Sequence, residues 1–364
     1  MFHPILAPYR IDMVNELSAH YDFTVCLLAN NLQGQKFNIA QLYKERLAIE
    51  PEFLLEKKYN GKPNIPRAII DSLNTHKPDV VLVSEYNLYV WVVLLYRMIH
   101  KAKFKIISLV DDCIDMLEHT NSVFVWHALS RKITVPYLDQ VIVVDHRAAD
   151  WYQRKYGKGA FFPLVSDDLI YRDRLQRVLP ISEEYVRRFH LQGKKVLLFV
   201  GRLSAEKNLP TAIIAFLKVK REDEVFVVVG DGPEREALKL RYGNSENVMF
   251  VGRYESDELY AWYNVGQVLI LPSTRETFGA VTNEALMAGC RVLLSDVAGS
   301  GCLIEDGKNG DFISPIDCDG MSKKITQALS FLSPVQLPLR VRPNRMPQSY
   351  QDYVTNLVQT IQIV

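Results

Sequence analysis

Short unbroken runs of Val, Ile and Leu recur along the chain, with longer amphipathic segments between them. Such runs are typical of strands that are buried on both faces of a parallel sheet. The segments between them, for example 209–220 and 279–288, are long enough for the crossover helices that parallel strands require. The pattern therefore predicts a doubly wound α/β fold. The predicted strands are 23–28, 80–83, 106–110 and 141–144 in the first half and 196–200, 225–229, 248–251, 268–271, 291–294 and 311–313 in the second.

This strand-helix rhythm is interrupted twice. The first interruption lies between residues 161 and 193, and we place a domain linker near 164–180. A second one, at 333–347, contains several prolines and arginines, and an amphipathic helix with Ser349 as N-cap follows it. A chain of 364 residues is long for one core and comfortable for two. We expect an N-terminal domain over 1–165 and a C-terminal domain over 180–335.

Composition and charge narrow the class of protein. Hydrophobic residues make up 48% of the chain and charged residues 23%, with a net charge of +1, so a nucleic-acid binder is not indicated. The five cysteines form no CxxC pair, which argues against structural zinc, and Cys26 and Cys290 lie in apolar runs that predict burial. No secretory signal is visible, and the longest apolar stretch, 91–96, is far shorter than the ~20 residues that span a bilayer. We expect a cytoplasmic protein, at most peripheral on the inner face of the cell membrane.

Two cations follow the first predicted strand of the second half. Residues 201–207 read G-R-L-S-A-E-K, and Gly201 permits a sharp turn at the carboxyl end of the strand, where α/β sheets bind ligands. Arg202 and Lys207 would bring two positive charges near one point. A diphosphate requires such charges, because its own negative charge grows as an attached sugar departs. A solvated basic loop with a Glu206 ion pair is the alternative.

The next two strand ends carry weaker signals. Residues 230–233, G-D-G-P, lack the third glycine of a dinucleotide-binding fingerprint. They therefore favour a tight strand-to-helix turn, with a close approach of Gly230 to a nucleotide as the alternative. Residues 251–254, V-G-R-Y, end another strand, and backbone polar groups around Arg253 would be able to read the edge of a base.

The most informative segment, residues 276–284, reads E-T-F-G-A-V-T-N-E and contains a helix start. Free amides over 278–282 would form an anion site at the positive end of the helix dipole. Glu276 precedes the helix and Glu284 lies about one turn inside it, so their carboxylates lie roughly 10 Å apart at a rise of ~1.5 Å per residue. That separation suits sugar hydroxyls and ribose hydroxyls on either side of a diphosphate, although a helix start with favourable acidic residues is the alternative.

The order and spacing of these segments resemble the family 4 glycosyltransferases and their GT-B relatives over about residues 195–330. The resemblance rests on G-R-L-S-x-E-K, G-D-G-P, F-V-G-R and above all the E-x(7)-E spacing of Glu276 and Glu284. It implies two Rossmann-like, doubly wound parallel-sheet domains that face each other across a cleft. The N-terminal domain would bind the acceptor and the C-terminal domain a nucleotide-diphosphate sugar, and the helix 349–364 would complete the N-terminal domain.

The resemblance also implies roles for individual residues. Arg202 and Lys207 match the pair that holds the donor diphosphate, Glu276 the glutamate near the transferred sugar, and Glu284 the residue that binds the ribose. These roles make Arg202, Lys207 and Glu276 the expected catalytic residues. The expected donor-binding residues are Gly201, Gly230, Arg253, Phe278, Gly279, Ala280, Val281 and Glu284.

A retaining transfer is also implied, and it has a physical rationale. The leaving diphosphate can itself accept the acceptor's proton on the same face of the sugar, so catalysis consists mostly of electrostatic stabilisation and positioning. No cofactor and no essential metal are expected, because GT-B enzymes generally do not need a metal. Residues 317–319, D-C-D, match a metal-binding D-x-D pattern but are better explained as a helix-start cap.

The first half departs from the commonest family pattern. Its first loop reads P-Y-R at residues 8–10, where Arg10 would contact phosphate or acceptor and Tyr9 would pack against a sugar; loop capping is the alternative. Asp111 replaces the histidine of a frequent His-Asp pair and is expected to contact the sugar, with an exposed turn as the alternative. Basic residues over 97–105 adjoin the apolar stretch 91–96. This pattern favours a buried helix with a solvated basic end over a surface for anionic lipid or a lipid-diphosphate acceptor.

The sequence thus predicts a retaining, metal-independent, hexosyltransferase-like enzyme of bacterial polysaccharide assembly. Its partners would be a nucleotide-diphosphate sugar and a glycan or lipid-linked acceptor, with peripheral membrane contact and no nucleic acid. The alternatives are a non-catalytic nucleotide-sugar-binding GT-B protein and a related sugar-nucleotide epimerase, which would be expected to lack the glutamate pair. The nucleotide, the sugar and the acceptor stay open at this stage.

Overall fold

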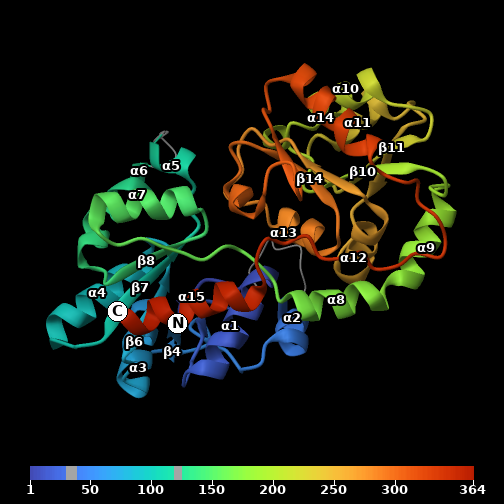
Figure 1. Cartoon of the computed structure of the whole chain (residues 1–364). Coiled ribbons are helices and arrows are strands. Elements are labelled where there is room, and N and C mark those ends of the chain that lie inside the picture. The colour runs from blue at the N-terminus through green and yellow to red at the C-terminus, as the bar shows by residue number, and fades with distance from the viewer. Residues whose placement is uncertain (30–38, 119–124) are drawn as a thin grey trace. The chain divides into compact units, whose positions relative to one another are not determined.

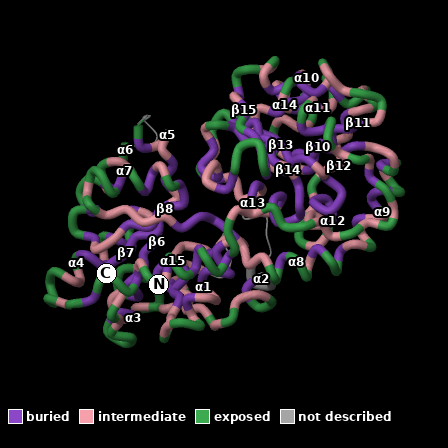
Figure 2. The backbone as a smooth tube through the Cα atoms, in the orientation of Figure 1, coloured by how far each residue is buried: buried purple, intermediate pink, exposed green. Residues whose placement is uncertain are grey.

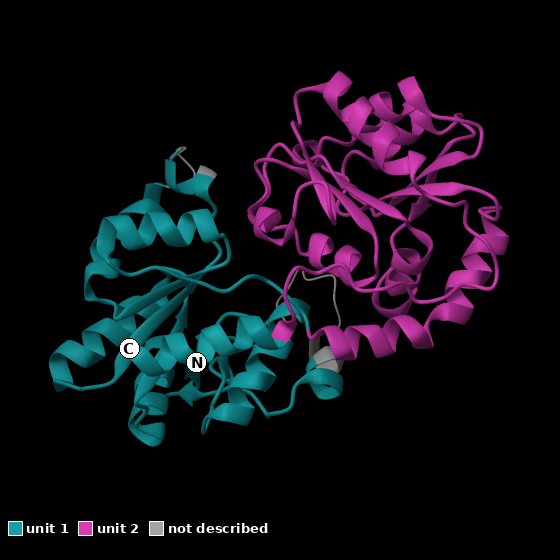
Figure 3. Ribbon diagram, in the orientation of Figure 1, with its two compact units in different colours: residues 1–166, 351–364 teal, residues 167–350 magenta. Residues whose placement is uncertain are grey.

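The chain forms two compact units in the computed structural model, which describes residues 1–29, 39–118 and 125–364. Unit 1 consists of residues 1–166 and 351–364, and unit 2 of residues 167–350 (Figure 3). Helix α15 (Tyr350–Ile363) lies almost entirely in unit 1, where the ring of Tyr353 contacts Phe161 edge to face. The C-terminal segment therefore belongs to the same unit as the N-terminus.

Unit 1 is built on a seven-stranded parallel sheet of order β3-β2-β1-β6-β7-β8-β9 (Figure 1). The chain winds outward from β1 in one direction and then in the other, which is the doubly wound arrangement that the apolar runs predict. The expected strand 23–28 contributes only two residues, and the two-residue strands on either side of it in the sheet, β1 and β3, were not predicted. The strands are β1 (Phe2–His3), β2 (Cys26–Leu27), β3 (Glu52–Phe53), β6 (Val80–Ser84), β7 (Lys105–Val110), β8 (Gln140–Val143) and β9 (Ala160–Phe161), and a hairpin joins β4 (Lys58–Tyr59) to β5 (Lys62–Pro63).

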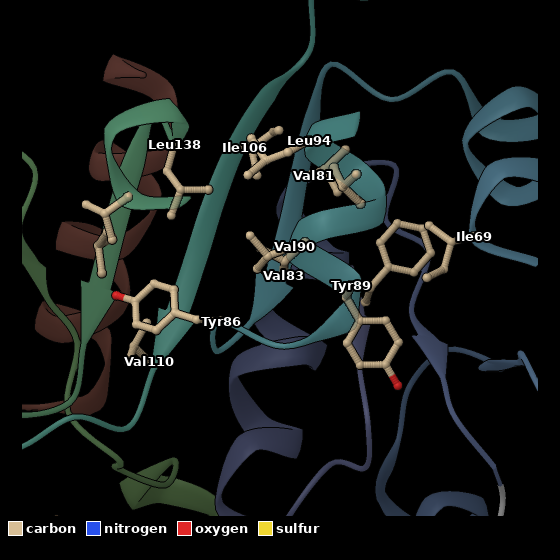
Figure 4. Packing of buried hydrophobic residues seen from close by; sticks show 14 of the residues in the cluster. Ile69, Val81, Val83, Tyr86, Tyr89, Val90, Leu94, Ile106, Val110 and Leu138 are labelled. Carbon is tan, nitrogen blue, oxygen red and sulfur yellow. The ribbon is translucent and has the colours of Figure 1, made fainter. Parts of the chain in front are cut away.

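Helices connect the strands of unit 1 and cover its core. Val90 of α4 packs with Val81 and Val83 of β6 and Ile106 of β7 in one buried cluster (Figure 4). Apolar burial of this kind is the main source of stability for such a unit. The helices are α1 (Pro8–His20), α2 (Ile39–Arg46), α3 (Ile65–His76), α4 (Leu88–His100), α5 (Ile114–Glu118), α6 (Val125–Thr134) and α7 (His146–Tyr156), with a 3₁₀ turn, η2 (Val135–Tyr137).

Unit 2 has a six-stranded parallel sheet of order β12-β11-β10-β13-β14-β15. Each of its strands coincides with a predicted apolar run to within one residue at either end, and β10, β11 and β13 are buried throughout (Figure 2). Strands β10 to β12 extend the sheet in one direction, and β13 to β15 extend it in the other. The direction therefore changes between β10 and β13, which lie side by side. The strands are β10 (Lys195–Val200), β11 (Glu224–Val229), β12 (Val248–Gly252), β13 (Val268–Leu271), β14 (Arg291–Ser295) and β15 (Gly310–Ile313).

The segment expected as a linker, 164–180, is largely helical. Asp167 caps α8 (Asp168–Arg177) by accepting hydrogen bonds from the amides of Leu169 and Ile170, and α9 (Leu179–Arg188) follows directly. Both helices pack on α12 in unit 2. The remaining elements of unit 2 are η3 (Ala205–Lys207), α10 (Leu209–Val219), α11 (Arg235–Tyr242), α12 (Ser256–Val265), α13 (Ala280–Met287), η4 (Gly299–Leu303) and α14 (Cys318–Ser330).

The proline-rich segment 333–347 runs along unit 2 without forming a helix or strand. Arg342 donates hydrogen bonds to the carbonyls of Tyr263 and Gly266, and Arg345 donates one to the carbonyl of Gly289. These carbonyls lie where α12 and α13 end, so the arginines satisfy acceptors that helix ends leave open. None of the helices in the described ranges has the length and hydrophobicity needed to cross a membrane.

Candidate functional site

The loops after β10 and β11 meet at the carboxyl edge of the unit 2 sheet. Gly230 has a φ of +151°, and a Cβ atom on it would lie 1.9 Å from the carbonyl oxygen of Gly201. A Cβ atom on Gly232 would similarly lie 2.3 Å from the carbonyl oxygen of Leu203. These glycines let neighbouring loops make backbone contact, which agrees with the interpretation of G-D-G-P as a tight turn. Helix α11 begins at Arg235, two residues after Pro233.

The loop after β10 is tied to the loop after β13. The side-chain amide of Asn208 donates hydrogen bonds to the carbonyls of Pro272, at 3.2 Å, and Pro315, at 2.8 Å. The backbone amide of Thr274 donates to the carbonyl of Glu206 at 2.9 Å. The two loops are distant in sequence, but they are neighbours because β10 and β13 are adjacent in the sheet. This edge is the switch point of the strand order, where ligands bind in open α/β sheets.

Lys207 and Glu276 form an ion pair across these two loops. Their side chains are 19% and 11% exposed, so the pair is partly shielded from water, and Ser273 also donates its hydroxyl to Glu276. A shielded carboxylate and ammonium interact more strongly than a surface pair, because water screens them less. The structure therefore joins two of the three residues that the sequence assigns to catalysis.

Arg202, the third of these residues, has an exposed side chain. Within the described part of the chain its guanidinium forms no hydrogen bond or ion pair, whereas its carbonyl accepts a hydrogen bond from the amide of Ser204 at 3.1 Å. The hydroxyl of Ser204 hydrogen-bonds to Glu206 and lowers the pKa of that carboxyl group, and the charges of Lys207 and Arg202 lower it further. Both cations thus lie within electrostatic range of the Glu206 carboxylate. The alternative of a solvated basic loop predicted an ion pair of Glu206, but Glu206 is hydrogen-bonded to Ser204 instead.

Helix α13 begins one residue after Gly279, which has a φ of +93°. A Cβ atom on Gly279 would lie 2.7 Å from Leu271 and 3.2 Å from the side chain of Glu276, so this position favours glycine for two reasons. The prediction of free amides over 278–282 is wrong at one end, because the amide of Thr282 donates to the carbonyl of Gly279 at 2.9 Å. The candidate anion contacts are then the amides of Phe278, Gly279, Ala280 and Val281.

The segment before α13 is held by the 3₁₀ turn η4. The amide of Ser300 donates to the carbonyl of Phe278 at 2.9 Å, and the ring of Phe278 is buried. A Cβ atom on Gly299 would lie 2.0 Å from the carbonyl oxygen of Thr277. These contacts hold the chain that leads into the helix start against η4, as a preorganised anion site requires.

Glu284 lies inside α13, where its carboxylate accepts a hydrogen bond from the hydroxyl of Tyr263 on α12 at 2.5 Å. Burial and the charge of Glu284 raise the pKa of Tyr263, which therefore stays protonated and donates. Burial and the same charge also raise the pKa of Tyr171 on α8. The two tyrosines come from helices distant in sequence, and no local pattern predicted them beside Glu284.

Two further predicted positions have local partners. Arg253, directly after β12, forms an ion pair with Glu255. Asp317 is the N-cap of α14, and its carboxylate accepts a hydrogen bond from the amide of Gly320 at 2.8 Å. The interpretation of D-C-D as a helix cap is confirmed.

In unit 1, the predicted residues Arg10 and Asp111 form an ion pair. Arg10 is buried on α1, and Asp111 follows β7 and donates its amide to Glu85 at 2.9 Å. Tyr9 is half-buried next to them, and burial raises the pKa of its hydroxyl. The three residues named from sequence in the first half therefore gather at one sheet edge.

The sequence missed a polar cluster of Glu85, Asp112 and His127 at the same edge. The Nε2 atom of His127 lies 3.1 Å from Glu85, and its Nδ1 atom lies 3.8 Å from Asp112. Burial raises the pKa of Glu85. Burial lowers the pKa of His127, but the hydrogen bond to Glu85 and the charges of Asp112 and Glu85 outweigh this effect and raise it. The φ of +58° at Glu85 is unusual for a residue with a side chain and often marks functional sites.

These three residues also have the chemistry of metal ligands, since one ligand atom from each lies within 4.8 Å of the others. Two observations favour a hydrogen-bonded network instead. The ring nitrogens of His127 face different carboxylates, and Asp112 already faces the guanidinium of Arg131 at 3.4 Å. A positive charge next to a carboxylate weakens its attraction for a cation.

Comparison with known proteins relates the chain to glycosyltransferases. Residues 182–332 match the family described as Glycosyl transferases group 1. The chain is 33% identical over 141 residues to an uncharacterized glycosyltransferase of Methanocaldococcus jannaschii, covering 38% of this chain and 36% of that protein. It is 29% identical over 199 residues to the alpha-D-kanosaminyltransferase of Streptomyces kanamyceticus, covering 52% of this chain and 50% of that protein. The chain thus spans from about a third to a half of the length of these curated relatives.

A solved structure resembles the whole chain. Anabaena HepE in complex with UDP and glucose superposes with a TM-score of 0.72 over 100% of this chain and 98% of that chain, at 16% sequence identity. Identity at this level carries the fold alone. Together with the two parallel sheets, it confirms the predicted fold class: two Rossmann-like α/β domains of the GT-B type.

Proposed function

We propose that this protein is a retaining glycosyltransferase that transfers a sugar from a nucleotide-diphosphate sugar to a glycan or lipid-linked acceptor in bacterial polysaccharide assembly. The observation that carries this proposal is the partly shielded Lys207–Glu276 pair at the switch point of the unit 2 sheet. The helix start of α13 follows in the same segment. The five cysteines are free, which supports a reducing compartment, and we propose that the reaction takes place in the cytoplasm.

In the proposed reaction, the donor diphosphate takes Lys207 as its counter-ion, and Arg202 and the amides of residues 278–281 bind it further. Glu276, released from Lys207, accepts a hydrogen bond from a hydroxyl of the transferred sugar. The bond between the anomeric carbon and the diphosphate oxygen breaks, the acceptor oxygen bonds to that carbon on the same face, and its proton passes to the diphosphate. These groups act by electrostatic stabilisation and positioning.

Glu284 provides the first test of the proposed donor site. If its carboxylate binds the ribose hydroxyls, Glu284→Gln should raise the KM for the donor by about 10-fold and leave kcat within about two-fold, because the contact exists before and during transfer. A donor that lacks the ribose hydroxyls should show no such difference between the variant and the native protein. Glu236→Gln, at an exposed glutamate of α11, is the matched control. An unchanged KM in Glu284→Gln would refute the ribose contact.

The substrates are found with a panel of nucleotide sugars and acceptors, measured by release of free nucleotide. HepE binds UDP and glucose, which supports UDP-glucose as the first donor to test. Nucleotide release that depends on the acceptor, with a product of the donor's anomeric configuration by NMR, supports the proposal. Binding without turnover would identify a non-catalytic nucleotide-sugar binder, and an epimerised donor would identify an epimerase.

We also propose that the reaction needs no metal or other cofactor. The two cations of the donor loop would supply the positive charge that a metal ion supplies elsewhere. Turnover in excess EDTA should therefore stay within about two-fold of turnover without the chelator. Loss of activity in EDTA that Mg²⁺ or Mn²⁺ restores would contradict this, and Asp112→Asn would then test the cluster of Glu85, Asp112 and His127 as the metal site.

A further inference from the structure

Two helices of unit 1 expose large hydrophobic side chains along one stripe each. On both helices the exposed hydrophobic residues are mostly three or four positions apart, which is the spacing of residues on one face of a helix. Their exposed fractions run from 41% to 70% on α4 and from 42% to 80% on α6. The residues are Leu88, Trp91, Leu95, Met98 and Ile99 on α4 and Val125, Trp126, Leu129 and Ile133 on α6, and Tyr137 of η2 continues the second stripe.

The helices that carry these stripes are neighbours. The indole of Trp91 on α4 donates a hydrogen bond to the hydroxyl of Ser130 on α6 at 3.0 Å. Arg97 on α4 donates to the carbonyl of Tyr137 in η2, the turn that follows α6. The opposite side of α4 is fixed in the core through Val90 and Val93. The stripes therefore form one surface, which we call the α4–α6 face and define by the ten residues named above.

The α4–α6 face is too rich in hydrophobic side chains for an ordinary protein surface. Seventeen large hydrophobic residues are exposed in the described part of the chain, and ten of them belong to this face. Scattered exposed hydrophobic residues are normal, whereas a gathering of this kind marks a surface that binds a partner. The expectation of a buried helix at residues 91–96 is thus wrong for one side of α4.

The charges around the face point to the chemistry of that partner. Neither α4 nor α6 contains an aspartate or a glutamate, and neither does the segment 101–105 between α4 and β7. Exposed basic residues are concentrated there instead, although the net charge of the whole chain is only +1. They are His100, Lys101, Lys103, Lys105 and Lys132. Asp139 lies nearby and pairs with Arg97 and Lys105, which leaves His100, Lys101, Lys103 and Lys132 as the basic residues beside the face. Trp, Leu and Ile beside Lys, on helices that carry no acidic residue, is the composition of a surface that lies in the headgroup region of an anionic bilayer.

We propose that the α4–α6 face docks this protein on an anionic phospholipid membrane. The apolar stripes enter the boundary between headgroups and acyl chains, while the lysines at the end of α4 and on α6 bind lipid phosphates. Helix α4 stays packed on the unit 1 sheet, and α6 stays bonded to α4 through Ser130, so in this proposal the protein lies on the bilayer and does not span it. This inference rests on the surface of unit 1 and is independent of the proposed reaction, although a docked enzyme would meet a lipid-linked acceptor directly.

The test is co-sedimentation of the full chain with vesicles, without any sugar donor. Vesicles of phosphatidylcholine with about 30% phosphatidylglycerol should bind the protein at least ~10-fold more tightly than pure phosphatidylcholine, and added salt should weaken the binding. Met98→Glu combined with Trp126→Glu should reduce binding to the anionic vesicles at least ~10-fold. Lys101→Gln combined with Lys103→Gln should reduce it by a similar factor and lower its salt dependence.

The control is Leu240→Glu combined with Ile316→Glu, two exposed hydrophobic residues of unit 2 that are each 88% exposed. This variant should bind the anionic vesicles as the native protein does, and circular dichroism should show all variants folded. Equal binding by the native protein and the Met98–Trp126 variant would overturn the proposal. It would also be overturned by a failure to bind anionic vesicles, or by self-association in solution that the Met98–Trp126 variant abolishes, since the face would then be a protein interface. A transfer assay with a soluble acceptor keeps these outcomes separate from the proposed reaction.

Discussion

Turnover should fall by at least ~100-fold when Lys207 is replaced by alanine, which is the scale of loss for a single group that stabilises charge in the transition state. In the proposed reaction, negative charge grows on the departing diphosphate, and Lys207 would lie beside it at the end of β10. Lysine at this position is partly shielded from water, which strengthens its interaction with an anion. We therefore expect kcat to fall and the affinity for the nucleoside diphosphate product to weaken as well. Initial rates and calorimetric binding of the diphosphate measure the two effects.

Lys218→Ala is the matched control for this experiment. Lys218 is an exposed lysine of α10 that pairs with Asp319 on the surface of unit 2, so its loss should change neither rate nor affinity. Lys207→Ala also leaves the carboxylate of Glu276 without its counter-ion, and this alone could lower stability or disturb the site. The double variant Lys207→Ala with Glu276→Gln removes that uncompensated charge. Recovery of near-native turnover in the double variant would show that Lys207 has only a structural role.

Glu276→Ala should also lower turnover by at least ~100-fold, but with a different effect on binding. Glu276 is proposed to bind the transferred sugar, which the nucleoside diphosphate product lacks. The affinity for that product should therefore stay unchanged or increase, since Lys207 no longer has a competing carboxylate. Glu276→Gln should lie between the native protein and the alanine variant, because its amide oxygen still accepts a hydrogen bond but carries no charge.

Glu222→Ala, at an exposed glutamate before β11, serves as the control and should behave as the native protein does. The combined results separate two roles for Glu276. If Glu276→Ala weakened diphosphate binding as much as Lys207→Ala does, its function would be to hold Lys207 in place rather than to bind the sugar. Near-native rates in both alanine variants, with the true substrates, would refute the proposed site.

The strands of unit 2 were predictable because parallel strands are covered on both faces and therefore read as unbroken apolar runs. Each of its strands coincides with such a run to within one residue. In unit 1 the signal was weaker, since β1, β2, β3 and β9 have two residues each. Helix α8 was missed because its buried side chains, Tyr171 and Leu175, are few and the surrounding polar residues resemble a linker. Its stability comes from packing on α12, which no local pattern records.

The local features of the candidate site also follow from sequence. The sequence alone shows that Gly279 precedes a helix start, that Glu276 lies ahead of this glycine, and that Glu284 lies about one turn inside the helix. Their partners depend on tertiary structure. Lys207 meets Glu276 because β13 pairs with β10, whereas β11 and β12, which lie between them in sequence, extend the sheet on the other side of β10. Tyr263 reaches Glu284 because α12 lies near α13. His127 and Glu85 are brought together from different elements in the same way.

The sequence by itself determined the parallel α/β fold class and the segments that end in candidate ligand-binding loops, since both depend on residues close along the chain. Tertiary structure alone decided which of those loops meet and which side of an apolar helix is covered. Helix α4 illustrates the difference. Its composition is apolar on more than one side, so sequence suggested burial, but the unit 1 sheet covers only the side that carries Val90 and Val93. Contact between distant segments, rather than local propensity, left Trp91, Met98 and Ile99 exposed.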